Sequence, residues 1–249
     1  MDGFRVLRNT QVVILGVCIA VATIVASVIL SQGFIHVMKM TREQITVTGS
    51  ANKPITSDYV VWRASFTVRD PDLAKAYRRL SGDLDLVKKC LLAKGITEQE
   101  LTVPQVGIEQ LYKKDEHGND TNEFTDYRLT QLVEVRSEDV EKVTQVSRTI
   151  TELIDQDVEL ISGSPEYIYR KLDELKLEML AEATQNAKQR AENMAKATGN
   201  RIGAIRSARM GVFQITPSTS TDVSDMGMND TSSMDKKVTA VVTASFAID

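Results

Sequence analysis

Few side chains in this sequence have the types and spacings that catalysis or metal binding requires. The chain has two histidines, His36 and His117, and neither has a cysteine or second histidine at a metal-ligand spacing. The G-x-S-x-G, Walker and G-x-G-x-x-G patterns are absent. The sequence therefore predicts no catalytic, cofactor-binding or metal-binding residue and no enzyme activity. His117 is either a pH-sensitive group or an ordinary solvated turn residue.

The sulfur-containing residues leave two further kinds of chemistry open. Cys18 lies in an apolar segment and Cys90 in a helical pattern, so we expect no disulfide between them. Cys90 is either a reactive thiol, activated by the lysines beside it, or a partly buried structural thiol. Met226, Met228 and Met234 are either incidental or a set of thioether ligands for Cu(I).

The composition is that of an ordinary folded chain. Its 249 residues are 42% hydrophobic and 26% charged, and the formal net charge is -4. These values separate the chain from disordered and collagen-like sequences. A small negative charge spread over residues of both signs does not indicate nucleic-acid binding.

An uncharged apolar segment runs from Val12 to Leu30. At about 1.5 Å per residue, a helix of this length spans the hydrocarbon core of a bilayer. The alternatives are a buried core helix and a signal peptide cleaved near residues 31–33, although the apolar region of a signal peptide is normally only about 7–15 residues long. We predict an uncleaved anchor in the lipid bilayer, with residues 1–40 as tail and anchor and residues 41–249 as one domain.

The charges beside the anchor bear on its orientation. Arg5 and Arg8 precede the segment, and Lys39 and Arg42 follow it, so the basic side chains balance. The amino terminus adds one positive charge on the first side. We therefore expect a cytoplasmic N-terminus and a domain on the outer face of the membrane.

Alternating apolar and polar side chains predict the strands of a mixed or antiparallel sheet after the anchor. The clearest strands are residues 60–68 and 238–248. Gly49 is expected to end a short strand that starts at Ile45, and Pro104 favours an edge or a bulge for the strand that contains it. The remaining strands are expected at residues 103–112, 127–135, 158–161 and 202–212.

Two shorter helices and one long helix are predicted between these strands. The first is capped by Asp70 and begins at Pro71. The second opens at Ser137, and the third spans residues 169–198. Their apolar stripes are Leu73, Tyr77, Leu80, Leu84, Val87 and Leu91; Val140, Val143, Ile150 and Leu153; and Leu172, Leu175, Met179, Ala183 and Ala187. Alanines as far as Ala195 form a small-residue side of the long helix that can accept a neighbour.

Two polar segments are predicted to connect strands. Residues 217–235 are poor in large apolar side chains and rich in turn formers, which is typical of a mobile loop of a hairpin. Residues 113–122 are expected to form the turn of another hairpin. The stretches 60–112 and 127–161 each run strand, helix, strand, which suggests a loose internal duplication.

The order of these elements resembles that of the SIMPL-domain family. The similar segments are Ile45 to Ala51, Asp70 to Ala76, Gly95-Ile96, Ala187 to Ala195, Gly199 to Gly203, and Val238 to Ile248. They carry no reactive group, so the resemblance informs the fold more than the activity. It implies an α+β domain exported to the bacterial periplasm or cell surface. Family members form ring or channel-like oligomers or are linked to stress tolerance, and a related animal protein is an adaptor in kinase signalling.

Two functional hypotheses follow. The first is a non-enzymatic envelope protein that self-associates into a ring or channel-like homo-oligomer and is linked to envelope or oxidative stress tolerance. Its contacts between copies would use the C-terminal strand and the small-residue side of the long helix. The second is a monomeric adaptor or ligand-binding module that captures a partner through residues 217–233. A hydrolase or redox enzyme is a third class, for which no residue constellation argues.

Overall fold

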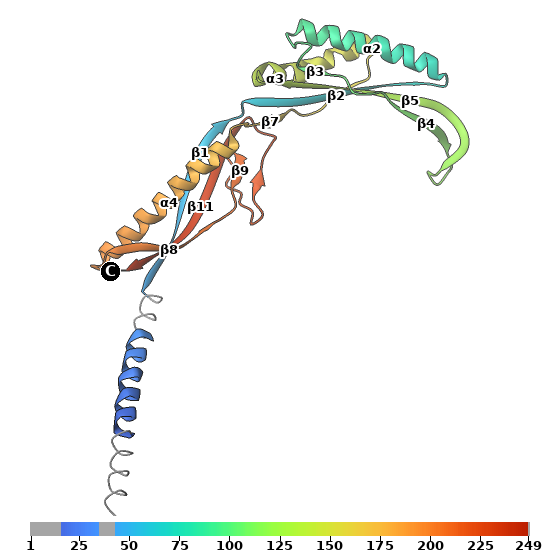
Figure 1. Ribbon diagram of the computed structural model, residues 1–249. Helices are drawn as coiled ribbons and strands as arrows, with labels where there is room; N and C mark the ends of the chain where they lie inside the picture. The colour runs from blue at the N-terminus through green and yellow to red at the C-terminus, as the bar shows by residue number, and fades with distance from the viewer. Residues whose placement is uncertain (1–15, 35–42, 249) are drawn as a thin grey trace, which may run out of the picture. The chain divides into compact units, whose positions relative to one another are not determined.

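The computed structural model describes residues 16–34 and 43–248. These residues form helices and two sheets, which confirms the predicted α+β fold (Figure 1). The chain divides into two compact units. One unit contains the residues up to Ser50, Glu182–Gly211 and the residues from Val241 onward, and the other contains Ala51–Ala181 and Val212–Ala240.

The N-terminal helix, Gly16–Phe34, is apolar and long enough to cross a membrane. It overlaps the predicted anchor and extends four residues past Leu30, whereas residues 12–15 of the prediction lie outside the described residues. All of its residues are exposed, so no described part of the chain covers them. This exposure argues against the alternative of a core helix, which would be mostly buried.

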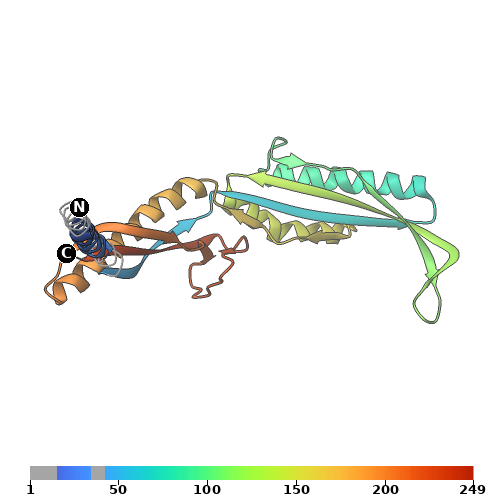
Figure 2. The same ribbon diagram turned by 60° about the horizontal axis from the view of Figure 1, so that its bottom comes forward.

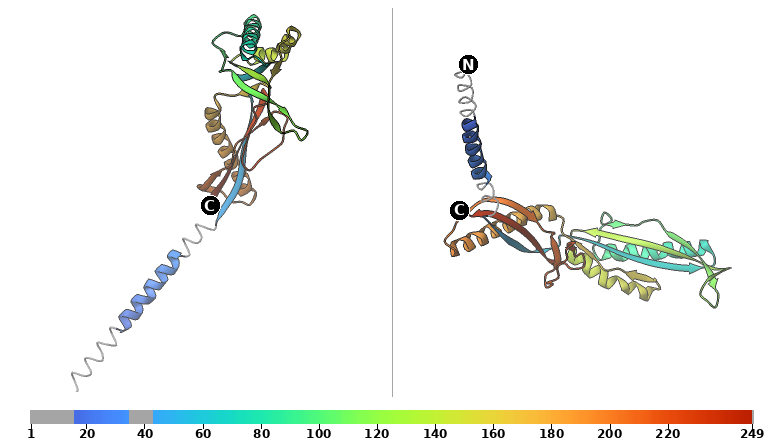
Figure 3. Two further views of the ribbon diagram at one scale, coloured as in Figure 1. Left: turned by 90° about the vertical axis from the view of Figure 1, so that its right-hand side faces the viewer. Right: turned by 90° about the horizontal axis from the view of Figure 1, so that it is seen from below.

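The first sheet packs against the long helix α4, Leu172–Ala197. Its strands follow the order β1-β11-β9-β10, and β8 also pairs with β11. The strands are β1 Gln44–Thr56, β8 Ile202–Met210, β9 Gln214–Pro217, β10 Met228–Asn229 and β11 Asp235–Ile248. Figure 3 shows α4 running along β1 and β11. In β11 the predicted alternation is confirmed, because every second residue from Val238 to Phe246 is buried.

Small residues allow β1 and α4 to approach closely. Ala183, Ala187 and Ala191 of α4 are fully buried. The contacts on this side of α4 come from the same chain, in a cluster of Val47, Ala187, Ala191, Ala244 and Phe246. The prediction that the alanine side accepts a neighbouring molecule is therefore wrong. The prediction that the strand ends at Gly49 is also wrong, because β1 continues through this residue against the backbone of α4.

The second sheet contributes the larger core. Its strands follow the order β3-β5-β2-β6, with β4 paired to β5 and β7 paired to β2. The strands are β2 Tyr59–Asp70, β3 Leu101–Thr102, β4 Gly107–Lys114, β5 Asp120–Ser137, β6 Leu160–Ser162 and β7 Glu166–Ile168. Every second residue of β2 from Val60 to Val68 is buried, as the alternation predicted. The two long strands β2 and β5 run side by side in Figure 2 and pair antiparallel.

Helix α2, Leu73–Ala93, packs on this sheet with a stripe that differs in part from the prediction. Leu80, Val87 and Leu91 are buried as expected, but Leu73 and Tyr77 are exposed. The helix starts later than predicted because Asp72 is its N-cap, with a carboxylate that accepts hydrogen bonds from the backbone N–H groups of residues 74 and 75. The carboxylate of Asp70 accepts from the Asp72 N–H instead.

Helix α3, Val140–Thr149, continues into the short 3₁₀ helix Ile150–Gln156. Its N-cap is Asp139 and not the predicted Ser137, whose hydroxyl accepts a hydrogen bond from the Asp139 N–H. The four predicted core residues are confirmed as buried: Val140, Val143, Ile150 and Leu153. They join the core cluster to which α2 and β2 also contribute.

Of the strand predicted at residues 103–112, only residues 107–112 are in a strand, β4, whereas Pro104 lies in the irregular segment between β3 and β4. Proline lacks the N–H that a central ladder position would need, which accounts for the break. The hairpin predicted around residues 113–122 is confirmed, because β4 and β5 pair antiparallel from Gly107↔Thr130 to Lys114↔Asp120.

Residues 217–235 join β9 and β11, which pair antiparallel as the predicted hairpin requires. The segment is more structured than the sequence suggested. It contains β10, which pairs parallel to β9, and Thr231 accepts a backbone hydrogen bond from Tyr167. Met234, near its end, packs against the core of the second sheet. The mobility of this segment stays a prediction.

Candidate functional site

A buried lysine, Lys236, lies at the start of β11. It occupies the strand face that continues with Val238 and Ala240, and only 3% of its surface is exposed. Lysine is rarely fully buried unless its ammonium has a partner, so this position separates Lys236 from the solvated lysines of the chain.

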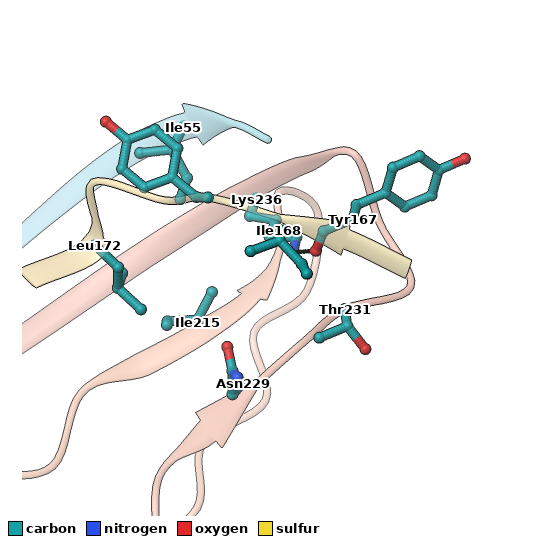
Figure 4. A pocket seen from close by; sticks show the side chains of 9 residues that line it. Ile55, Tyr167, Ile168, Leu172, Ile215, Asn229, Thr231 and Lys236 are labelled. Carbon is teal, nitrogen blue, oxygen red and sulfur yellow. Dashed lines mark hydrogen bonds between the residues drawn. The ribbon is translucent and has the colours of Figure 1, made fainter. Parts of the chain in front are cut away.

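The ammonium of Lys236 has a defined hydrogen-bond partner. Its Nζ donates to the backbone carbonyl oxygen of Tyr167 at 2.6 Å, which Figure 4 marks with a dashed line. Tyr167 is itself held in place, because its N–H donates to the carbonyl of Thr231 at 2.8 Å and its hydroxyl is 3.0 Å from that of Thr144. The acceptor of Lys236 is therefore positioned by two other segments, those of Thr231 and Thr144.

Lys236 lines a cavity of about 220 Å³. The lining residues shown in Figure 4 come from β1, the segment that includes β7, the start of α4, β9 and the loop after it. The aliphatic walls are Ile55, Ile168, Leu172 and Ile215. The polar side chains are Asn229, Thr231 and Lys236, and the tyrosines Tyr167 and Tyr169 complete the lining. The cavity is thus lined mainly by aliphatic and aromatic side chains, with one cation among them.

The electrostatics of the cavity are dominated by burial. Burial lowers the pKa of the Lys236 ammonium, and the nearby Asp230 carboxylate opposes this effect. Burial also raises the pKa of Asp230, but hydrogen bonds from Ser232 outweigh it, so the pKa of this carboxyl is lowered. Asn229 and Thr231, which flank Asp230 in the sequence, both line the cavity, so Asp230 lies near it. Asp230 and Lys236 do not form an ion pair within 4.0 Å.

Sequence reasoning missed Lys236, although the sequence carries a signal for it. The alternation that predicts a strand over 238–248 continues back by one step to residue 236, which shares the inner face. A lysine at an inward position of a strand is an exception to the rule that inward-facing side chains are apolar, and it indicates a buried partner for the ammonium. The partner of Lys236 could not be found in this way, because Tyr167 lies 69 residues away.

The structure places the other candidate residues apart from this cavity. Cys90 is partly buried in α2, and burial raises the pKa of its thiol, which favours the structural interpretation over the reactive one. His117 is exposed in the turn of the β4–β5 hairpin, where its N–H donates to Asp115. Cys18 is exposed on the N-terminal helix, and His36 lies outside the described residues.

The three methionines of the 217–235 segment differ in their surroundings. Met226 is 94% exposed, whereas Met234 packs against the core. Met228 is a half-buried residue of β10. Among residues 16–34 and 43–248, no group of three or more His, Cys, Asp or Glu side chains is arranged to hold a metal ion.

A second candidate surface is the end of the β4–β5 hairpin, residues 107–127, which we call the arm. Its side chains are largely exposed, and Figure 2 shows it extending past the end of α2. Three aromatic rings gather on it: the centroids of Tyr112 and Phe124 are 6.3 Å apart, and those of Phe124 and Tyr127 are 4.9 Å apart. The exposed aromatic surface of the arm is available for contact with another molecule.

Comparison with known proteins identifies a family but no activity. The SIMPL profile, described as a protein of unknown function (DUF541), matches residues 45–246. No curated protein matches the chain. A hydantoinase/carbamoylase family amidase from Burkholderia ambifaria is similar at 14% identity, over 53% of this chain and 35% of the amidase, with a TM-score of 0.28. An uncharacterized conserved protein from Listeria innocua is similar at 15% identity, over 80% and 92% of the two chains, with a TM-score of 0.18. Neither structure supports an argument about activity.

Proposed function

The chain belongs to the SIMPL family, and from this premise we propose that it is a membrane-anchored bacterial envelope protein that self-associates through the arm. The proposal includes no enzymatic step. The observation that carries it is the apolar surface that the chain leaves uncovered, on the N-terminal helix and on the arm.

The helix Gly16–Phe34 supports the membrane half of the proposal. Large apolar side chains are exposed all along it, and a bilayer would cover them. We propose that the helix is retained, with the domain in the periplasm. Extraction at alkaline pH should leave the protein in the membrane, and protease added to spheroplasts should digest the domain. Release of the protein, or a mature chain that begins after Phe34, would instead identify a signal peptide.

The arm supports the assembly half. Tyr112 and Phe124 are 38% and 40% exposed, and Ile108 on the same strand as Tyr112 is 57% exposed. In the described part of the chain β4 pairs with β5 alone, so its other edge presents backbone donors and acceptors. Exposed apolar side chains beside an open strand edge are typical of a surface that pairs with another strand.

The sequence of β4 favours a second copy of the chain as the partner. In an antiparallel pair of two β4 strands centred on Leu111, Glu109 of one copy faces Lys113 of the other. Within its own hairpin Glu109 pairs with Arg128 at 3.0 Å, and Lys113 pairs with Glu123 at 3.2 Å. The charges of Arg128 and Glu109 from one copy and Lys113 and Glu123 from the other would therefore alternate in one row. This row stabilises the pairing centred on Leu111 over pairings shifted along the strand.

The test is the mass of the full-length protein in detergent, measured by light scattering. We expect a multimer for the natural protein and a shift to monomer for the double variant Tyr112→Lys, Phe124→Lys. The matched control is Tyr77→Lys, Leu92→Lys, which alters exposed apolar residues of α2 and should leave the multimer intact. Circular dichroism checks that all three proteins are folded. A monomeric natural protein, or an arm variant that stays multimeric, contradicts the proposal.

Exposed apolar residues of the 217–233 loop favour a second candidate function, capture of another protein. Val223 is 80% exposed and Met226 is 94% exposed. If this alternative holds, a deletion within 219–226 abolishes partner capture and leaves assembly unchanged.

A role in envelope or oxidative stress tolerance is tested by comparing survival of a deletion strain that carries the natural gene with one that carries the arm variant.

A further inference from the structure

We propose that the cavity around Lys236 is a binding site for a small aliphatic carboxylate, whose head group pairs with the Lys236 ammonium and whose chain contacts the apolar walls. This site is separate from the arm, so the proposal does not depend on self-association.

The hydrogen bonds of Lys236 leave room for a ligand. An ammonium carries three N–H donors. Among the described residues, Nζ makes one hydrogen bond, to the carbonyl of Tyr167, and no ion pair within 4.0 Å. Two donors of a side chain that is 97% buried are therefore available inside the cavity. A carboxylate has two oxygens that can accept both of them.

The walls of the cavity select the rest of the ligand. Ile55, Ile168, Leu172 and Ile215 surround the space with aliphatic groups. An aliphatic chain placed against them loses its contact with water, which favours binding. At about 30 Å³ per water, 220 Å³ corresponds to roughly seven water molecules. The ligand is therefore small, because drug-sized ligands occupy about 300–1,000 Å³.

The charges near the cavity favour a single negative charge over a larger one. Lys236 is the one cation in the lining, and Asp230 is close enough to stabilise its charged form. A phosphate would bring more negative charge than one lysine offsets, beside a carboxylate that repels it. The side chains of Asn229 and Thr231 can complete the hydrogen bonds of a monoanionic head group without adding charge.

Burial supplies the driving force for the ion pair. The Lys236 ammonium is already removed from water, and the resulting cost is reflected in its lowered pKa. A bound carboxylate would provide an opposite charge in direct hydrogen-bond contact with the ammonium, which the more distant Asp230 does not supply. The cost of desolvating the lysine is thus met on folding, and binding needs to desolvate only the ligand.

The experiment uses full-length protein in dodecyl maltoside and isothermal titration with hexanoate, and it compares hexanamide, which has the same shape without the charge. Two variants are measured beside the natural protein: Lys236→Met, and the control Lys237→Met. Lys237 points away from the cavity, with its Nζ 2.9 Å from the carbonyl of Ser220. We expect saturable hexanoate binding to the natural protein and to the control, at least about tenfold weaker binding to Lys236→Met, and at least about tenfold weaker binding of hexanamide.

Three results overturn the proposal: no saturable binding of hexanoate, equal binding of hexanamide, or equal binding by Lys236→Met. A second variant decides the matter if Lys236→Met fails to fold. Leu172→Phe keeps the lysine and fills part of the cavity. It should weaken hexanoate binding at least about tenfold, and unchanged binding by this variant also contradicts the proposal.

Discussion

Gly49 of β1 lies against the backbone of Ala187 in α4, so closely that a Cβ at Gly49 would stand 2.7 Å from the Ala187 Cα. The same Cβ would collide with the Ala187 nitrogen and with the carbonyl oxygen of Ala183. These obstacles are backbone atoms of a helix, which cannot move aside as a flexible side chain can. The contact between β1 and α4 therefore depends on a glycine at this position.

Gly49→Ala should lower the free energy of unfolding by at least about 2 kcal/mol, because the strand and the helix must separate to admit one methyl group. Urea unfolding followed by circular dichroism measures the change. The control is Gly82→Ala in α2, where no atom lies within 4 Å of the added Cβ. This variant should be more stable by about 0.5–1 kcal/mol, because alanine favours the helix. Equal effects of the two substitutions would contradict the close contact.

Glu134→Gln should destabilise the protein in a pH-dependent way. Burial raises the pKa of the Glu134 carboxyl, but hydrogen bonds from Arg136 and Arg63, both 2.6 Å long, outweigh it and lower the pKa. The folded state then binds fewer protons than the unfolded state, so this stabilisation is complete above about pH 4.5 and is lost as the pH falls through the lowered pKa.

At pH 7 the loss in Glu134→Gln should be about 2 kcal/mol, since hydrogen bonds to a charged group are replaced. The difference from the natural protein should shrink below about pH 4.5. Glu123→Gln is the control, because its pair with Lys113 is exposed and should contribute little. A difference that does not vary with pH would show that the effect comes from packing and not from the carboxylate.

Lys236→Met should also change the pH dependence of stability, but in the alkaline range. Burial lowers the pKa of Lys236 from its usual 10.5, so the unfolded state binds more protons than the folded state between the lowered pKa and 10.5. The cost of burying the ammonium is complete below the lowered pKa and disappears as the pH rises to about 10.5. The natural protein should therefore gain stability relative to Lys236→Met as the pH rises from 7 to 10, whereas Lys237→Met should not show this trend.

Cys90 should react slowly with thiol reagents. Burial raises the pKa of its thiol and restricts access, and both effects reduce the concentration of reactive thiolate. In a Cys18→Ala background, the rate with a maleimide at pH 7 should be at least about tenfold below that of free cysteine. After unfolding in urea the rate should approach the free value. A fast reaction in the folded protein would revive the interpretation of a reactive thiol.

Local patterns in the sequence predicted most of the regular structure. The alternation over residues 60–68 and 238–246 corresponds to a buried face of β2 and of β11, because successive side chains of a strand point to opposite sides. Most residues of the opposite face are partly buried. Leu80, Val87 and Leu91 were predicted correctly because their spacing places them on one side of a helix. Helix starts were less accurate, since Asp70 and Asp72 are both suitable caps by residue type.

Contacts between distant segments could not be derived from such patterns. The alanines of α4 suggest a surface for another molecule when the helix is considered alone, and only the tertiary structure shows that β1 and β11 occupy it. Likewise the sequence shows that Lys236 follows the inward period of its strand, but the acceptor at Tyr167 depends on how two remote segments meet. Periodicity depends on the geometry of one element, so the sequence by itself determined the strands, the helices and the apolar N-terminal segment. The covered alanine face and the cavity at Lys236 were decided by tertiary structure, because they depend on which elements pack together.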